Sequence, residues 1–132
     1  MTLVVDASVV VAALVDGGDA GAWAEQVLLS DHLVAPHLMP VEAANILRRA
    51  RVAAEVSSDS LALAHADLLD LQVDLFPYAL VADRAWALGP NLTAYDACYV
   101  ALAELLGADL ATLDRRLARS PGPLCAFLLP PG

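Results

Sequence analysis

Short apolar runs that end at a charged residue or a proline alternate along the chain with longer segments in which apolar residues recur at helical spacing. The short runs are typical of buried strands and lie at 3–5, 33–35, 73–76, 110–113 and 124–129. The segments between them predict helices over 8–15, 19–29, 40–49, 57–71, 78–88 and 94–106, with a short helix after Asp114. This alternation predicts an α/β fold with a mostly parallel central sheet and helices on both faces.

Two of the predicted helices carry further detail. The helix 94–106 has Thr93 as its N-cap and Gly107 as its stop signal. The helix 40–49 begins at a proline, which is favoured in the first helical turn. Its expected buried side consists of apolar residues at helical spacing, namely Val41, Ala44 and Leu47.

The length of the chain fits one domain. At 132 residues, it leaves no room for a second independent core, so we expect a single domain over 1–129 and a short tail over 130–132. Hydrophobic residues make up 59% of the chain, compared with roughly 45–50% in an average protein. A chain this short can therefore fill its core and still keep apolar surface for a partner.

The charge of the chain excludes several functions. There are 16 acidic residues against seven arginines, and the net charge of −9 argues against broad non-specific binding to nucleic acid or anionic lipid. The sequence contains no lysine, which excludes a P-loop nucleotide hydrolase, Schiff-base chemistry and a receiver domain. A phosphatase of the haloacid dehalogenase type needs a second aspartate two residues after the first, where Ser8 follows Asp6.

No targeting or membrane segment is expected. The apolar stretch 3–15 has no basic residue before it, contains Asp6 and is too short to span a bilayer. The two cysteines, Cys98 and Cys125, form neither a metal motif nor a disulfide framework. These observations favour a cytoplasmic protein.

Four acidic residues stand where predicted elements begin or end. Asp6 and Asp114 each follow an apolar run. Glu42 lies near the start of a helix, and Asp96 lies in the first turn of another. Each could simply start a turn, cap a helix or face solvent. Because ligands bind at the carboxyl ends of parallel strands, however, we expect the four carboxylates to gather there.

The negative charge of four clustered carboxylates must be compensated, since like charges repel and burial raises the free-energy cost of each charge. A hard divalent cation supplies the compensating charge, and a ligand set made only of oxygens favours Mg²⁺ or Mn²⁺ over zinc. Mg²⁺ also binds phosphate oxygens, so a phosphodiester is the expected substrate.

Four segments around these acids resemble the successive motifs of PIN-domain ribonucleases, and most closely the VapC group of type II toxins. The segments are the runs VVDAS at 4–8, PVEAANILRR at 40–49, TAYDACYVALA at 93–103 and ATLDRRL at 111–117. Their order and spacing agree over essentially the whole chain. The resemblance implies a PIN-like three-layer α/β/α sandwich and metal-dependent cleavage of RNA. The expected reaction uses water activated by the metal and leaves 5′-phosphate and 3′-hydroxyl ends.

The resemblance also assigns roles to individual residues. Asp6 and Asp96 would be the principal ligands of Mg²⁺ or Mn²⁺. Glu42 would bind the metal directly or through water, and Asp114 would complete the set. The residues that would support these acids are Ser8, Thr112 and Asn45.

Partners follow from the same resemblance. A VapB-type antitoxin would cover the acidic crevice and insert a basic side chain, and the family commonly forms homodimers. Arg115 and Arg116 lie just after Asp114 and are candidates for RNA contact, although they could equally be solvated. The alternative to an enzyme is a catalytically silent PIN-like module that binds RNA or protein.

Overall fold

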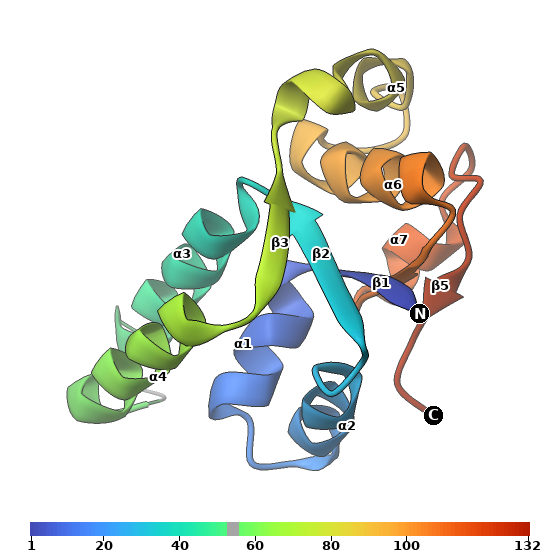
Figure 1. Cartoon of the computed structure of the whole chain (residues 1–132). Coiled ribbons are helices and arrows are strands. Elements are labelled where there is room, and N and C mark those ends of the chain that lie inside the picture. The colour runs from blue at the N-terminus through green and yellow to red at the C-terminus, as the bar shows by residue number, and fades with distance from the viewer. Residues whose placement is uncertain (53–55) are drawn as a thin grey trace.

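The computed structural model describes residues 1–52 and 56–132. Its described residues contain a five-stranded sheet in which all paired strands are parallel (Figure 1). The strands are β1 (Thr2–Val5), β2 (His32–Pro36), β3 (Val73–Phe76), β4 (Asp109–Ala111) and β5 (Phe127–Leu128). They lie side by side in the order β3-β2-β1-β4-β5. The chain therefore builds outward from β1 in both directions, and the order reverses between β1 and β4, where open α/β sheets bind ligands.

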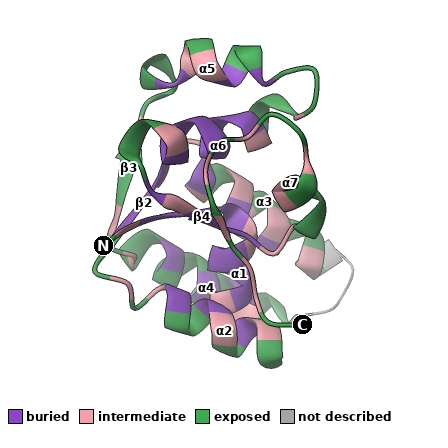
Figure 2. Ribbon diagram, turned by 90° about the vertical axis from the view of Figure 1, so that its right-hand side faces the viewer, coloured by how far each residue is buried: buried purple, intermediate pink, exposed green. Residues whose placement is uncertain are grey.

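Helices cover both faces of this sheet, which confirms the predicted three-layer α/β/α architecture (Figures 1 and 2). One face carries α1 (Ala7–Val15), α2 (Asp19–Val27), α3 (Met39–Val52) and α4 (Ser58–Asp70). The other face carries α6 (Ala94–Leu106), which packs against β1, β2 and β4, and α5 (Ala82–Ala87), which packs against α6. A short helix, α7 (Arg115–Arg119), follows β4.

The core lies on both sides of β1. Val4, Val5 and Leu110 on the two central strands are completely buried. On α6 every residue from Ala97 to Ala103 is buried, so this helix lies inside the molecule, whereas α5 is largely exposed (Figure 2). An apolar helix without a polar face is stable only when it is covered all round.

The prediction for the buried side of α3 was wrong at Val41, which is 72% exposed. The buried row is Met39, Ala43 and Leu47, which recur every four residues and face the core. This rotation leaves Ala44 half-buried and turns Val41 toward the solvent. Spacing alone admits both rows, and packing against the neighbouring helices selects one of them.

Other predicted boundaries also differ from the structure, and the strand expected over 124–129 is reduced to the two residues of β5. The segment 78–88 is not one helix: a 3₁₀ turn, η1 (Tyr78–Leu80), precedes α5, and the backbone at Val81 departs from helical values at φ −121°, ψ 1°. The strand expected over 110–113 ends at Ala111. Beyond it, the side chain of Thr112 is used to bind Asp6 rather than to extend the sheet's core. Across the described residues, no helix has the length and apolarity needed to cross a bilayer.

Candidate functional site

Asp6 lies where β1 gives way to α1, and its carboxylate is held by three donors. Its backbone N–H donates to the carbonyl of Ala111 at 3.2 Å, which joins the ends of β1 and β4. Its Oδ1 accepts from the Ser8 hydroxyl at 2.5 Å and from the Val9 amide at 3.2 Å. Its Oδ2 accepts from the Thr112 hydroxyl. Only 8% of Asp6 is exposed, so the carboxylate has a fixed direction.

The two hydroxyl groups that hold Asp6 also hold the chain that leaves β4. Thr112 is fully buried, and its Oγ1 accepts from the Asp114 amide at 3.0 Å. Ser8 Oγ accepts from the Leu113 amide at 3.3 Å. Each hydroxyl therefore donates to Asp6 while accepting from the backbone next to Asp114. This arrangement fixes the ends of β1 and β4 relative to each other, although Asp6 and Thr112 are 106 positions apart in the chain.

Glu42 lies in the first turn of α3 and is paired with Tyr99, a residue that the sequence analysis missed. The Tyr99 hydroxyl donates to Glu42 Oε1 at 2.6 Å. Tyr99 is only 2% exposed, and burial together with this hydrogen bond raises the pKa of its phenol, so the hydroxyl remains a donor. The sequence could have indicated a role for Tyr99 through its position, because it lies three residues after Asp96 on α6 and so shares a helix face with it.

Asp96 and Asp114 are both placed by helix caps. The Asp96 amide donates to Thr93 Oγ1 at 3.2 Å, which confirms Thr93 as the N-cap of α6. Asp114 is the N-cap of α7, and its Oδ1 accepts from the amides of Arg116 at 2.9 Å and Leu117 at 3.2 Å. Capping fixes the start of each helix and with it the position of each carboxylate.

The charges of the four acids are coupled. Burial raises the pKa of Asp6, its hydrogen bonds oppose the rise, and the charge of Asp96 adds to it. Burial raises the pKa of Glu42 against the bond from Tyr99, and the charges of Asp96 and Asp6 raise it further. Burial and the charge of Asp114 raise the pKa of Asp96. The charges therefore act between neighbouring acids: Asp6, Glu42 and Asp96 are linked to one another, and Asp114 is linked to Asp96.

This cluster has the chemistry of a site for a hard cation, since all of its donors are carboxylate oxygens. The charge of Arg116 lowers the pKa of Asp96 and so offsets part of the repulsion. Among the described residues, no three His, Cys, Asp or Glu side chains already stand as a group that could hold an ion.

The remaining candidate residues differ in what their side chains contact. Asn45 is exposed on α3, and within the described part of the chain its side chain makes no hydrogen bond to the acids. Arg115 donates to the carbonyl of Pro130 at 2.6 Å, toward the C-terminal segment. Arg116, in contrast, lines a recess together with Asp96 and Asp114.

Two openings flank the acids. A groove of about 710 Å³ lies between α3 and α4 and reaches the start of α6; its lining includes Glu42, Asn45, Arg48, Arg49 and Tyr95. A polar recess of about 250 Å³ lies beside Asp96 and Asp114. The acids therefore lie between two surfaces that a long substrate could occupy.

Known proteins are similar to this chain in sequence and in fold. The family model for the PIN domain matches residues 3–122. Ribonuclease VapC1 of Mycobacterium tuberculosis is 39% identical over 128 residues, which are 96% of each chain.

Two solved structures are similar in fold. The crystal structure of PAE2754 from Pyrobaculum aerophilum superposes with a TM-score of 0.71 at 26% identity, covering 96% of this chain and 83% of the other. VapBC2 from Rickettsia felis, bound to a DNA fragment from its promoter, superposes with a TM-score of 0.62 and covers 98% of each chain. At 11% identity, the second likeness concerns the fold alone.

Proposed function

This chain belongs to the PIN-domain family, and we propose that it is an endoribonuclease of the VapC type, dependent on Mg²⁺ or Mn²⁺ and neutralised by a VapB-type antitoxin. The observation that carries the proposal is the hydrogen-bond network through Ser8 and Thr112, which joins Asp6 to the backbone at Asp114 where the strand order reverses. The identity to Ribonuclease VapC1 supports the choice of RNA as substrate.

The metal ligands we propose are Asp6 and Asp96, with Glu42 and Asp114 completing the set. Their oxygens suit Mg²⁺ or Mn²⁺, which, when bound, would activate water and stabilise the leaving oxygen of the phosphodiester. Asp6 is already held by three hydrogen bonds. Tyr99 holds one oxygen of Glu42, so the other oxygen of Glu42 and the Asp96 carboxylate are the groups that would adjust as an ion binds.

The chain's own residues have supporting tasks in this reaction. Ser8 and Thr112 keep the Asp6 carboxylate oriented, and Tyr99 keeps one oxygen of Glu42 engaged so that the other can face the site. Arg116 supplies a positive charge next to Asp96, where a substrate phosphate can be held. Cleavage is expected to leave 5′-phosphate and 3′-hydroxyl ends.

The test is incubation of the purified protein with total RNA, with Mn²⁺ or Mg²⁺ and in matched samples containing EDTA. Fragments with 5′-phosphates that appear only with metal support the proposal. Asp96→Asn is expected to abolish both cleavage and the heat of Mn²⁺ binding in calorimetry. Metal binding without cleavage of any RNA would instead indicate a catalytically silent binding module, and an active Asp96→Asn variant would contradict the assigned ligand.

The antitoxin is proposed as a basic partner. The chain carries a net charge of −9, and its uncompensated carboxylates suit an inserted arginine or lysine. The neighbouring groove between α3 and α4 offers exposed apolar side chains at Val41, Leu69 and Tyr95. Co-purification with the product of an adjacent small gene, lost when the partner's basic residues near its C-terminus are removed, would support this assignment.

A homodimer is proposed from a second apolar surface. Tyr78, Leu80 and Trp86 are exposed on η1 and α5, and Trp86 is 83% exposed. Exposed aromatic side chains of this kind are enriched in interfaces. Sedimentation should therefore give a dimer that Trp86→Glu converts to a monomer. A monodisperse monomer of the parent protein at high concentration would contradict the dimer.

A further inference from the structure

The polar recess beside the acids lies between the loop that precedes α6 and the short helix predicted after Asp114. One wall is the segment between α5 and α6, and the other is α7 with the residue that follows it. The side chains that line it are Asn91, Leu92, Thr93, Asp96, Asp114, Arg116, Leu117 and Ser120. Two of the four acids thus form part of its lining, so whatever occupies the recess lies next to the reacting centre.

The recess contains groups able to recognise a ligand. Asn91 is exposed, and within the described part of the chain its side-chain amide makes no hydrogen bond. Such an amide offers both donors and an acceptor. The Ser120 hydroxyl donates to the Arg116 carbonyl at 2.9 Å and keeps its acceptor capacity. Arg116 is exposed and adds a positive charge.

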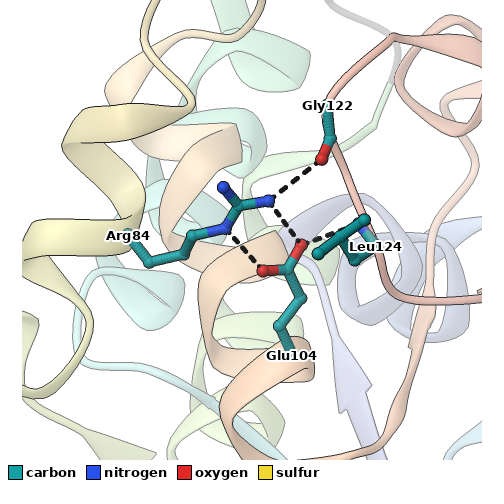
Figure 3. A network of polar contacts seen from close by, with 4 residues as sticks. All are labelled: Arg84, Glu104, Gly122 and Leu124. Carbon is teal, nitrogen blue, oxygen red and sulfur yellow. Dashed lines mark hydrogen bonds and ion pairs between the residues drawn. The ribbon is translucent and has the colours of Figure 1, made fainter.

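A polar network remote from the acids holds the loop that follows Ser120, although none of its residues lines the recess (Figure 3). Arg84 on α5 donates to both carboxylate oxygens of Glu104 on α6, at 2.6 and 3.2 Å, and to the carbonyl of Gly122 at 3.0 Å. Glu104 also accepts from the Leu124 amide at 2.7 Å. This network ties the loop after Ser120 to both helices.

The same loop lies against Asn91. Gly122 has φ +109°, a conformation that L side chains rarely adopt, and a Cβ there would lie 3.4 Å from the Asn91 amide nitrogen and 3.3 Å from Leu88. The positive φ, rather than the space around a Cβ, is what favours glycine at residue 122. The loop after Ser120 is therefore held beside Asn91, at the edge of the recess.

The size and the chemistry of the recess select the ligand. Its volume of about 250 Å³ is below the roughly 300–1,000 Å³ of sites for drug-sized molecules. It suits the base of one unpaired nucleotide, and unpaired RNA is recognised through hydrogen bonds to the edges of its bases. Asparagine amides match the donor and acceptor pair on a base edge, and arginine matches phosphate.

We propose that this recess binds one unpaired nucleotide of the RNA next to the cleaved bond, with Asn91 contacting its base and Arg116 its phosphate. The assignment rests on the proposed nuclease function. It makes Asn91 a determinant of sequence preference at one position beside the cut, separate from the metal ligands.

The test compares cut sites in a random single-stranded RNA library, cleaved with Mn²⁺ by the parent protein, Asn91→Ala and Gln26→Ala. Gln26 is an exposed amide on α2, so it controls for the loss of a surface amide. Asn91→Ala should lose the base preference at one position and lower kcat/KM on the preferred sequence about tenfold. Gln26→Ala should match the parent. Calorimetry should give equal Mn²⁺ affinity for all three proteins.

The outcomes separate the two proposals. If the parent and Asn91→Ala show the same base preference, the nucleotide subsite is wrong while the nuclease function stands. If Asn91→Ala loses Mn²⁺ affinity, Asn91 acts on the metal centre and the subsite is also wrong. If the parent cleaves no RNA, the proposed function fails, and the subsite fails with it. Arg116→Gln should raise KM, and Arg116→Lys should recover part of the loss.

Discussion

Replacing Thr112 with valine removes one hydroxyl from the centre of the site and little else. The side chain is completely buried, so the change cannot be relieved by solvent. Its Oγ1 donates to Asp6 Oδ2 and accepts from the Asp114 amide at 3.0 Å. Valine has a similar shape but leaves the buried carboxylate without one donor and the amide without its acceptor.

The expected cost follows from these two bonds. A hydrogen bond to a charged group contributes about 1.5–3 kcal/mol, and a neutral one about 0.5–1.5 kcal/mol. Thr112→Val should therefore lower the free energy of unfolding by about 2–4 kcal/mol at neutral pH. The Thr112 bond lowers the pKa of Asp6, so its loss raises that pKa further. The cost is consequently largest where Asp6 is ionised and shrinks as the pH falls and Asp6 becomes protonated.

Urea unfolding at neutral and acidic pH measures this cost, with Thr112→Ser as the matched control. Serine keeps the hydroxyl and loses only a methyl group, which is worth about 0.8 kcal/mol. In calorimetry, Thr112→Val should also weaken Mn²⁺ binding by about 10–100-fold, because Asp6 loses its orienting partner. A valine variant as stable as the serine variant at both pH values would refute the assigned role of the hydroxyl.

Three further changes test other parts of the structure. Asp96→Asn should raise the free energy of unfolding of the metal-free protein at neutral pH, because the raised pKa of Asp96 means that its ionised form destabilises the fold. Urea unfolding at neutral and acidic pH checks this prediction, since the gain in stability should vanish in acid. Gly21→Ala places a Cβ 1.8 Å from the Asp16 carbonyl oxygen and should cost about 1–3 kcal/mol in unfolding experiments, whereas Gly17→Ala meets nothing within 4 Å and should cost little. Burial raises the pKa of Glu104, but the hydrogen bonds from Arg84 and Leu124 outweigh burial, so the pKa is lowered. Glu104→Gln should therefore lower the melting temperature at neutral pH, and the difference from the parent should disappear in acid. Equal losses of melting temperature at both pH values would contradict the ion pair.

Elements governed by local rules were predicted closely. The helix α6 begins after Thr93 and ends at Gly107, as its capping residues indicate, and Gly107 has the left-handed φ of +63°. The strand β3 covers the predicted residues. The placement of acids at strand and helix ends also followed from the sequence, because a parallel sheet brings these ends together.

Features that depend on packing were not predicted. Val41 lies in a second helically spaced row with Ala44 and Leu47, and only packing against the neighbouring elements excludes it from the core. In the sequence, Tyr99 fits the pattern of a buried helix like its apolar neighbours. Its hydrogen bond to Glu42 depends on how α6 and α3 face each other, which the sequence pattern does not show. The recess at Asn91 brings the loop before α6 together with α7, and the sequence carries no periodic signal for that contact.

The repulsion among the acids connects stability, metal binding and inhibition. Three carboxyl groups have raised pKa values, so the folded protein carries unfavourable charge at neutral pH. Any cation that binds only the folded state recovers part of this free energy, about 2.7 kcal/mol when it is present at 100 times its Kd. A divalent ion and a basic side chain of an antitoxin would both neutralise the same carboxylate charges, so each should weaken the binding of the other. Because such coupling is reciprocal, an antitoxin that displaces the metal must itself be weakened by the metal to the same degree.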